Sequence, residues 1–357
     1  MKIIHCADLH LDSPLSTHMT DEQARTRNTE LIQTFIRLTK YAHDNDVRVV
    51  LITGDLFDGE RVKARTVDEV LDAIKNTPEV DYLYLPGNHD NASHAFSDHE
   101  LPQNLKRFST KWGTVTYDNV GISGIEMTED NAHQLYNTVP HIPGKINVVA
   151  LHGQVGTASG IDQVNLKLLR EKGIDYLALG HIHTYTVERL DSKGVYCYPG
   201  CLEGRGFDEC GEKGFVLLEN EKERLISQFI PFSCRQLFLV PVDITGLTKN
   251  PEVLKAMESA ADRISADDMV EFVLTGASDP TSNIAIPHLK KMLRSKFFFS
   301  KIKDESKIAI NPTDYKNDVS LKGAFIRKVL NSELTDDEKA SVIRAGLAAL
   351  SGEDILI

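Results

Sequence analysis

The sequence predicts an α/β protein in which two sheets form a layered sandwich. Apolar, β-branched runs alternate with helical patterns early in the chain, and several strand-like runs then follow without helices between them. The length of 357 residues suits two domains, or one large domain with an appendage. A hydrophobic share of 41% and a charged share of 26% are those of a globular protein.

The first 90 residues supply alternating strands and helices. "KIIHCA" predicts a short strand, and "VRVVLIT" at 47–53 is a continuous apolar run typical of a strand that is buried on both faces. Helices are predicted at 28–43 and 66–76, because apolar residues recur there at helical spacing and Thr66 can cap the second helix. A third strand, "YLYLP", ends at Pro86.

Two further apolar strands come from the middle of the chain. "INVVALHG" covers 146–153 and "YLALGHIH" covers 176–183, and each ends in histidine. The runs "GVYCYP", "GFVLLEN" and "RLISQFIP" then predict three strands joined by glycines and charged turns. These strands, added to the first three, are enough for two sheets.

The character of the chain changes near Ser233–Arg235. Strand-like "QLFLVPVDI", "MVEFVLTG" and "KFFFSKI" alternate with helices predicted at 251–263 and 286–295, which indicates a small α/β domain. The tail is predicted to be helical, and Thr335 and Glu338 form a capping box at the start of its last helix. The predicted domains are therefore 1–234, 235–305 and 306–357.

Five predicted strands end in side chains that can bind a metal. These are Asp8 and His10; Asp55 and Asp58; Asn88, His89 and Asp90; His152; and His181 with His183. Because ligands gather at the carboxyl ends of strands in open α/β sheets, we expect these groups to converge. Asp90 can instead be read as local support for the turn.

The ligand types narrow the choice of metal. Carboxylates, imidazoles and an amide oxygen without thiolates favour Mn²⁺, Fe²⁺ or Zn²⁺ and argue against a structural zinc site. A carboxylate such as Asp55 can bridge two ions, as in sites that promote in-line displacement at phosphorus. Two divalent cations beside Asp8 and Asp55 would leave positive charge, which attracts phosphate although the chain carries a net charge of −12.

The blocks "DLH", "GDLFD", "GNHD", "LHG" and "GHIH", in this order over residues 8–183, resemble the signature of the calcineurin-like metallophosphoesterases. The resemblance implies an α-β-β-α sandwich that hydrolyses phosphoesters with two divalent metals, Mn²⁺ first, with Fe²⁺ or Zn²⁺ as alternatives. It implies one metal held by Asp8, His10, Asp55 and His183, and a second held by Asp55, Asn88, His152 and His181.

The same resemblance implies separate roles for His89 and Asp58. His89 would stabilise the transition state or protonate the leaving oxygen, and Asp58 would orient its ring. A histidine beside two cations needs a carboxylate partner if it is to hold a proton.

Two longer segments indicate a particular group within this family. "HCADLHLDSPL" and "YPGCLEGRGFDECGEKGF" resemble the SbcD-type bacterial DNA repair exonucleases, over about residues 1–240. This implies a Mn²⁺-dependent exonuclease or endonuclease on DNA, with 235–305 as a capping domain. It also implies that the tail helices bind an SMC-like (SbcC-type) ATPase and that the subunit forms a homodimer. Packing of the apolar stripes of the tail on their own domain stays an open alternative.

Contacts with DNA are expected at basic side chains near the metal ligands. The candidates are Arg61, Lys63 and Arg65 in "GERVKART", and Arg205. The tract 288–303 is the densest basic and aromatic stretch. The alternative for the basic loop residues is that they are simply solvated. The alternative for the tract 288–303 is that it forms a helix and a strand of the core.

Composition bears on the binding of nucleic acid, on the cellular compartment and on membrane association. A net charge of −12 does not favour non-specific binding of nucleic acid by the whole surface. The five cysteines are an odd number, which fits a reducing cytoplasm better than a disulfide framework. No apolar stretch approaches the length of a membrane span, and the start lacks the apolar region of a signal peptide.

Two rival functions remain open from sequence. One is a phosphatase or cyclic-nucleotide phosphodiesterase with the same metals, which would need neither a capping domain nor a tail that binds a partner. The other is a non-catalytic scaffold with a vestigial site, against which the complete ligand set argues.

Overall fold

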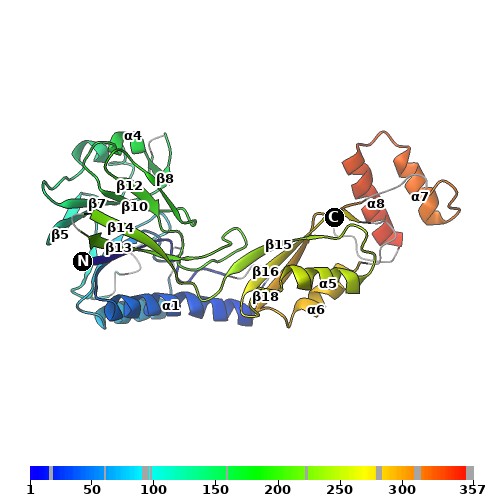
Figure 1. The fold of residues 1–357 in the computed structure, drawn as a ribbon, viewed down its shortest axis with the longest axis horizontal. Coiled ribbons are helices and arrows are strands. Elements are labelled where there is room, and N and C mark those ends of the chain that lie inside the picture. Colours follow the sequence, from blue (N-terminus) through cyan, green and yellow to red (C-terminus); the bar gives the residue numbers. More distant parts are fainter. Residues whose placement is uncertain are drawn as a thin grey trace. The chain divides into compact units, whose positions relative to one another are not determined.

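The chain forms two compact units, Met1–Gln236 and Leu237–Ile357, called unit 1 and unit 2 below (Figure 1). The computed structural model describes the chain apart from residues 16–18, 60–61, 91–95, 97–98, 158–159, 222–223, 279–283, 309–314 and 351–357.

Unit 1 contains two six-stranded mixed sheets. The first has the order β14-β13-β1-β2-β3-β4 and the second β11-β12-β10-β7-β6-β5. The first sheet consists of β1 (Lys2–Cys6), β2 (Val47–Thr53), β3 (Asp81–Leu85), β4 (Leu105–Arg107), β13 (Gly214–Glu221) and β14 (Arg224–Pro231). The second consists of β5 (Gly113–Tyr117), β6 (Val120–Gly124), β7 (Ile146–His152), β10 (Tyr176–Gly180), β11 (Thr186–Arg189) and β12 (Val195–Tyr198).

The central strands of unit 1 are buried on both faces, because the two sheets pack against each other and other elements cover their outer faces. Val49 and Leu51 of β2 lie in one core with Val148 and Ala150 of β7, so that core fills the space between the sheets. The alternate residues of β2 point the other way, toward the helices. A side-chain period of two thus explains why apolar residues occupy nearly every position of β2, where Arg48 is the exposed exception.

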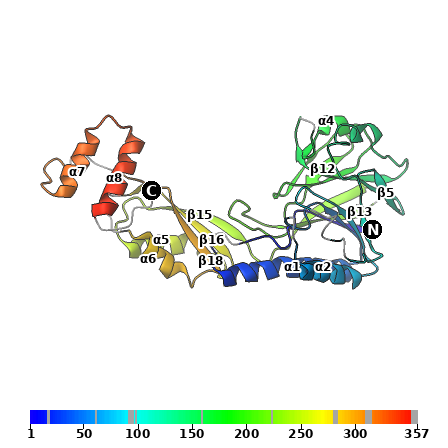
Figure 2. The same ribbon diagram turned by 180° about the vertical axis from the view of Figure 1, so that it is seen from behind.

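Helices cover the outer face of the first sheet, and a thinner layer covers the second. Helices α1 (Asp21–Asp44) and α2 (Ala64–Lys75) lie side by side (Figure 2) and pack on the first sheet. The outer face of the second sheet is covered by the short helix α4 (Leu166–Leu169) and the 3₁₀ helix η1 (Leu135–Thr138). The predicted α-β-β-α class is confirmed.

Both long helices of unit 1 begin earlier than predicted. Helix α1 starts at Asp21, where Thr20 and Gln23 form a capping box ahead of the apolar stripe. Helix α2 starts at Ala64 without a side-chain cap, so the prediction that Thr66 caps it was wrong. The carboxylate of Asp12 instead accepts the backbone N–H that precedes α2 at 2.9 Å, because a negative charge is favourable at a helix N-terminus.

Unit 2 begins with a three-stranded parallel sheet in the order β15-β16-β18. The strands are β15 (Leu237–Asp243), β16 (Met269–Thr275) and β18 (Phe299–Asp304), and the helices are α5 (Asn250–Ala260) and α6 (Ile286–Leu293). Val240, Phe272 and Ile302 share one core with Met257 of α5 and Leu289 of α6. Both helices therefore pack on one face of this sheet.

Short elements complete the described chain. Strands β8 (Gln154–Val155) and β9 (Gln163–Val164) pair in unit 1, and β17 (Ala277–Ser278) and β19 (Lys307–Ile308) pair in unit 2. Helices α7 (Leu321–Leu330) and α8 (Asp336–Leu350) share a small core that includes Tyr315, Ile326, Val329 and Ile343.

The predicted capping box at the start of α8 is present. The Glu338 carboxylate accepts the Thr335 backbone N–H at 2.8 Å, and Thr335 Oγ1 accepts the Glu338 N–H at 3.4 Å. Within the described part of the chain, no helix combines the length and apolarity that crossing a membrane requires.

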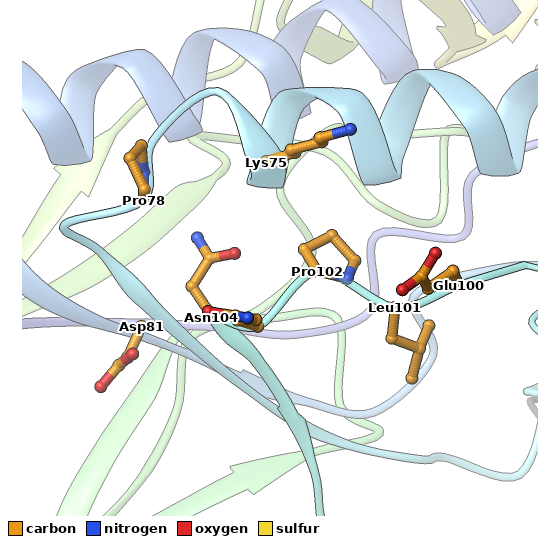
Figure 3. Close-up of a pocket in the computed structure, with 8 residues that line it drawn as sticks. Lys75, Pro78, Asp81, Glu100, Leu101, Pro102 and Asn104 are labelled. Carbon is orange, nitrogen blue, oxygen red and sulfur yellow. The ribbon is translucent and has the colours of Figure 1, made fainter.

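A pocket on unit 1 lies between the end of α2 and the starts of β3 and β4 (Figure 3). Its polar groups already serve the fold. Asn104 Nδ2 lies 2.9, 3.0 and 3.0 Å from three backbone oxygens, among which its two N–H groups are shared. The Asp81 carboxylate accepts from the Tyr117 hydroxyl at 2.7 Å and from Lys106 at 3.0 Å. The lining of this pocket includes none of the predicted site residues.

Candidate metal centre

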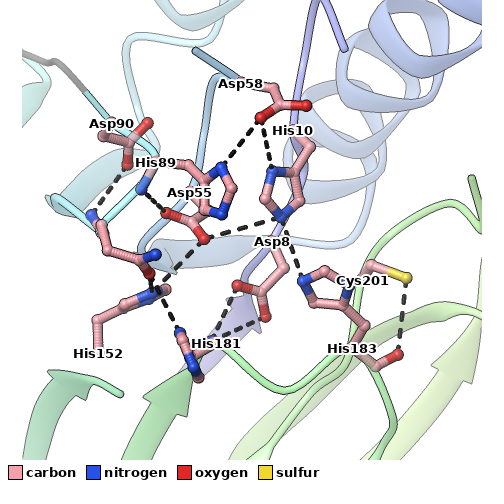
Figure 4. Close-up of polar contacts among 12 residues, drawn as sticks. Asp8, His10, Asp55, Asp58, His89, Asp90, His152, His181, His183 and Cys201 are labelled. Atoms are coloured by element: carbon pink, nitrogen blue, oxygen red, sulfur yellow. Dashed lines mark hydrogen bonds and ion pairs between the residues drawn. The ribbon is translucent and has the colours of Figure 1, made fainter. Parts of the chain in front are cut away.

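The side chains predicted to bind metal converge at the carboxyl ends of parallel strands from both sheets (Figure 4). Three groups have ligand atoms within 4.8 Å of one another: Asp8, His10 and His183; Asp8, Asp55 and His152; and His10, Asp58 and His89. Asn88 and His181 join them, because Asn88 Oδ1 lies 2.9 Å from His152 Nε2 and 3.1 Å from His181 Nδ1. Five strand ends that are far apart in sequence, from two sheets that pack against each other, thus contribute to one cluster.

The backbone bends sharply where these side chains leave their strands. Asp8, His10, Asp55 and His181 have positive φ angles of 53°, 45°, 51° and 102°. Non-glycine residues rarely adopt this conformation, which costs of order 1–3 kcal/mol at each position. Such strain persists only where the surroundings impose it, and it is typical of functional sites.

Two glycines let the loops of the cluster approach closely. A Cβ atom on Gly54, which has φ +97°, would lie 1.9 Å from His152 Nδ1. A Cβ atom on Gly87 would lie 2.2 Å from Asp55 Oδ1. Only glycine fits at either place without moving a candidate ligand.

Two carboxylates of the cluster are buried beside each other. Asp8 and Asp55 are each 1% exposed. Burial, and then the charge of Asp55, raises the pKa of Asp8 well above its ordinary value. The Asp8 carboxylate accepts the His181 backbone N–H at 2.9 and 3.1 Å, which ties β1 to the strand of the second sheet. Such a pair of buried carboxylates needs a compensating positive charge.

The histidine rings are turned so that unprotonated nitrogens face the interior of the cluster. His152 Nδ1 lies 2.9 Å from the Thr53 carbonyl oxygen, to which it donates, so its Nε2 carries a lone pair. That Nε2 lies 2.9 Å from Asn88 Oδ1 and 3.5 Å from Asp55 Oδ2, which are both acceptors. Acceptors facing one another at these distances are satisfied by a bound cation.

A second set of acceptors meets at His10. Its Nε2 lies 3.2 Å from His183 Nε2 and 3.7 Å from Asp55 Oδ2. Burial lowers the pKa of His10, which favours the neutral ring that a metal requires. Asp55 Oδ2 therefore lies near the ring nitrogens of both His10 and His152, each of which can bind a metal. The donor chemistry of the cluster fits two divalent cations better than any network of hydrogen bonds alone.

His89 lies at the open side of the cluster. Its side chain is 49% exposed, its backbone N–H donates to Asp55 Oδ1 at 2.9 Å, and its Nδ1 lies 3.1 Å from Asp58 Oδ1. Asp58 also accepts from the Ser13 hydroxyl at 2.6 Å. The nearby His10 ring, and then Ser13, keep the pKa of Asp58 well below its ordinary value. Asp58 is thus a carboxylate acceptor with several protein donors.

Asp90 connects the loops that carry Asp55 and His89. Its carboxylate accepts the backbone N–H groups of Leu56 at 3.2 Å, Phe57 at 2.9 Å and Gly87 at 3.0 Å. Burial raises the pKa of Asp90 to about 6. The sequence reading of Asp90 as support for a single turn was too narrow, because it holds two loops together.

The predicted DNA-contact residues fall into three classes. Arg61 lies outside the described residues. Lys63 pairs with Asp12 and Arg65 pairs with Glu69 at 2.7 Å, and both side chains are exposed, at 72% and 89%. Arg205 is only 18% exposed and lies beside Asp58, inside the cluster rather than on an open surface.

Sequence reasoning missed Glu209 and Ser13. The Glu209 carboxylate faces His183 Nδ1 at 2.6 Å, and Ser13 donates to Asp58. Glu209 stands four residues after Arg205 in a glycine-rich loop, and an ion pair at that spacing is a usable signal. Ser13 follows His10 by three residues in "DLHLDS" and carries no signal of its own.

Comparison with known proteins gives a consistent picture. A family model described as calcineurin-like phosphoesterase matches residues 1–185. An "uncharacterized metallophosphoesterase YhaO" of Bacillus subtilis is 28% identical over 236 residues, which cover 61% of this chain and 57% of that protein.

Two proteins named "DNA double-strand break repair protein Mre11" are also similar. The one from Methanopyrus kandleri is 25% identical over 274 residues, covering 68% of this chain and 59% of that protein. The one from Saccharolobus solfataricus is 22% identical over 401 residues, covering 100% of this chain and 97% of that protein. This chain therefore spans less than two thirds of the length of two of these three relatives.

Proposed function

This chain belongs to the calcineurin-like phosphoesterase family and is a metal-dependent phosphoesterase, and we propose that its substrate is DNA. In this proposal it is a Mn²⁺-dependent exonuclease or endonuclease, the nuclease subunit of a DNA repair complex of the SbcCD type. Fe²⁺ and Zn²⁺ are the alternative metals. The two relatives named for DNA double-strand break repair support the choice of DNA.

The two-metal part of the proposal rests on the position of Asp55. Its Oδ2 lies 3.7 Å from His10 Nε2 and 3.5 Å from His152 Nε2, which suits a carboxylate that bridges two ions. We assign Asp8, His10, Asp55 and His183 to one ion, and Asp55, Asn88, His152 and His181 to the other. Bound divalent ions supply Lewis-acid stabilisation of the phosphoryl oxygens and lower the pKa of water.

His89 is the residue proposed to act on the substrate. Because Asp58 accepts from its Nδ1, the Nε2 of His89 is left for a substrate on the open side. There it stabilises charge on the phosphoryl group or donates a proton to the leaving oxygen. Asp58 holds the ring in this orientation, and Ser13 holds Asp58.

The remaining proposals concern partners. Exposed apolar side chains on or beside the tail helices, including Val319 at 98% and Leu321 at 72%, support a docking role for the tail. The partner proposed is an SMC-like (SbcC-type) ATPase, with a homodimer of this chain as a further assembly.

The proposed domains are 1–234 for the nuclease, 235–305 for the cap and 306–357 for the tail.

The test of the substrate compares linear, end-labelled DNA with p-nitrophenyl phosphate esters, each with Mn²⁺. We expect metal-dependent cleavage of the DNA. Hydrolysis of the small esters with intact DNA would instead favour a phosphatase or cyclic-nucleotide phosphodiesterase. Metal binding without any hydrolysis would favour a scaffold.

His89→Ala separates chemistry from metal binding. We expect cleavage to fall by a factor of about 10²–10⁴, the usual contribution of a positioned acid or base, while Mn²⁺ binding measured by calorimetry is unchanged. Persistent cleavage would overturn the assignment of His89. Gln134→Ala, at the end of the loop before η1, is a control outside the cluster.

Contacts with DNA are proposed at Arg61, Lys63 and Arg65. Replacing Lys63 or Arg65 by alanine should weaken DNA binding equally for all sequences and reduce the salt slope by about 1 per lost phosphate contact. An unchanged slope would mean that the loop does not touch the backbone of DNA. Arg205 was the fourth candidate from the sequence, but its pairing with two carboxylates favours the role argued next instead of a contact with DNA.

A further inference from the structure

The imidazole of His183 is held from behind by groups that have no role in the proposed reaction. Its Nε2 faces His10 Nε2 at 3.2 Å, toward the interior of the cluster. Its Nδ1 lies 2.6 Å from Glu209 Oε1 on the opposite side, and the Glu209 side chain is only 6% exposed. The main-chain oxygen of His183 accepts from Lys213 Nζ at 2.7 Å, and Lys213 is buried as well. Ring and backbone of His183 are thus both held.

Arg205 connects this support to the support of His89. Its Nη2 lies 3.0 Å from Glu209 Oε1, and its Nη1 lies 3.5 Å from Asp58 Oδ2. Its backbone N–H donates to Glu209 Oε2 at 2.7 Å, so side chain and main chain hold the same carboxylate. One guanidinium therefore lies between the carboxylate behind His183 and the carboxylate beside His89.

A carboxylate behind a histidine decides which nitrogen can bind a metal. When Nδ1 donates its proton to Glu209, Nε2 keeps the lone pair that faces the cluster. The carboxylate also makes the ring more basic and fixes its plane, and removal of such a group commonly weakens metal binding 10–100-fold. Arg205 in turn limits the movement of Glu209, because a planar guanidinium can bond two carboxylates in fixed directions.

We propose that Glu209 and Arg205 are positioning residues of the metal centre, Glu209 for the Nε2 of His183 and Arg205 for Glu209 and Asp58 together. This inference rests on the proposed metal centre but not on the choice of DNA as substrate. Arg205 is then engaged with carboxylates of its own chain rather than with the phosphates of the substrate.

The test of Glu209 is calorimetric titration of the metal-free protein with Mn²⁺. In Glu209→Gln, which keeps the shape of the side chain but loses its charge, one of two sites should bind 10–100-fold more weakly. The other site should stay within about threefold of the unchanged protein, and thermal unfolding should show that the fold is intact. Glu212→Gln, an exposed glutamate of the same loop, is the matched control. Equal Mn²⁺ binding by Glu209→Gln and the control would overturn the proposal.

A spectroscopic measurement covers the case in which Glu209→Gln does not fold. In the metal-free protein, long-range ¹H–¹⁵N spectra of the imidazoles should show His183 protonated at Nδ1 and not at Nε2. The signal is assigned with a His183→Gln variant. Protonation at Nε2 would overturn the role of Glu209.

The test of Arg205 uses Arg205→Lys, which keeps the charge but cannot bond two carboxylates at once. If Arg205 is a positioning residue, kcat should fall about 10–100-fold by the same factor for DNA and for a p-nitrophenyl phosphodiester, with KM unchanged. A raised KM and a reduced salt slope on DNA, with the small ester unaffected, would overturn the proposal and make Arg205 a DNA contact. Arg224→Lys, at an exposed site, is the control.

These outcomes separate the inference from the proposed function. If the unchanged protein binds two Mn²⁺ ions but leaves DNA intact, the choice of DNA fails and the titration of Glu209→Gln still tests the inference. If the unchanged protein cuts DNA while Glu209→Gln binds Mn²⁺ normally, the inference fails and the proposed function stands.

Discussion

Both units of this protein contain parallel strands that end in aspartate, but the aspartates behave differently. In unit 1, Asp55 follows β2, is 1% exposed and lies within 4 Å of two histidine rings. In unit 2, Asp243 ends β15 and is exposed. Its Oδ1 accepts the backbone N–H and the hydroxyl of Thr245, at 2.9 and 2.6 Å.

The difference teaches that a carboxylate at a strand end is not enough to make a site. The aspartates of unit 1 face a second sheet, whose strands β7 and β10 carry histidines to the same rim. The three-stranded sheet of unit 2 shares its core with helices α5 and α6, and the described residues of that core include no strand of a second sheet. Its described carboxylates at the ends of β15 and β18 therefore bond to their own turns.

The largest expected effect on activity comes from replacing the strand-end aspartate of unit 1 by asparagine, and the same substitution in unit 2 is its control. Asp55→Asn removes one negative charge from the centre of the cluster, so we expect phosphoester hydrolysis to fall by at least ~10³-fold, about 4 kcal/mol in transition-state free energy. Mn²⁺ binding should weaken in parallel. Initial rates and calorimetry measure the two effects.

Asp243→Asn is the matched substitution in unit 2. It should leave both hydrolysis and metal binding unchanged. If Asp55→Asn retained full activity, or if Asp243→Asn lost it, the contrast between the two strand ends would be wrong.

A smaller effect is expected at Asp90, which holds two loops of unit 1 together. Asp90→Ala leaves three backbone N–H groups without their acceptor, so the free energy of unfolding should fall by about 3 kcal/mol. Urea unfolding of the metal-free protein measures this. Asp130→Ala, an exposed aspartate of the same unit, should change it little. A loss equal to that of the control would mean that water replaces the carboxylate.

The sequence predicted the parts of the fold that depend on continuous apolar runs. Strands β2, β7 and β10 are buried on both faces over most of their length, and a buried strand is recognisable from a run of mainly apolar residues. The hairpin of β5 and β6 was not predicted. Strand β5 is short, with alternating exposure and polar residues, and its pairing becomes clear only beside the rest of the sheet.

The same division applies to the site. The residues expected to bind metal stand directly after apolar runs, where position along the chain carries information. Glu209 lies in a loop without periodicity, and its partner His183 is 26 residues away. Tertiary packing brings the loop of Glu209 beside His183, so the sequence alone could not assign this pair.

A third prediction concerns His5, which is buried between the strands of unit 1. Its ring nitrogens lie 2.9 Å from the Tyr176 hydroxyl and 2.9 Å from Thr53 Oγ1. Burial lowers the pKa of His5 from 6.5 to about 3, so the ring is neutral in the folded protein. The unfolded chain binds a proton near pH 6.5 and the folded chain does not. Stability is therefore complete above pH 6.5 and is lost as the pH falls toward 3.

The measurement compares the free energy of unfolding at pH 7 and pH 5 with EDTA present. In His5→Gln, the fall between these pH values should be smaller than in the unchanged protein by about 2 kcal/mol. His133→Gln, at an exposed position of the same unit, is the control for loss of a histidine. An unchanged pH dependence in His5→Gln would mean that His5 becomes charged without unfolding.

The smallest effect is expected where the comparison began, at the strand ends of unit 2. The hydrogen bonds of Asp243 to Thr245 lie in an exposed turn, and an asparagine can accept them through its own Oδ1. Asp243→Asn should therefore shift the midpoint of thermal unfolding by no more than about 1 °C. A large fall would mean that this carboxylate has a second partner and that unit 2 also depends on the charge at its strand end. The strand-end aspartates of the two units would then lie in different surroundings, but both units would depend on the charge of their aspartate.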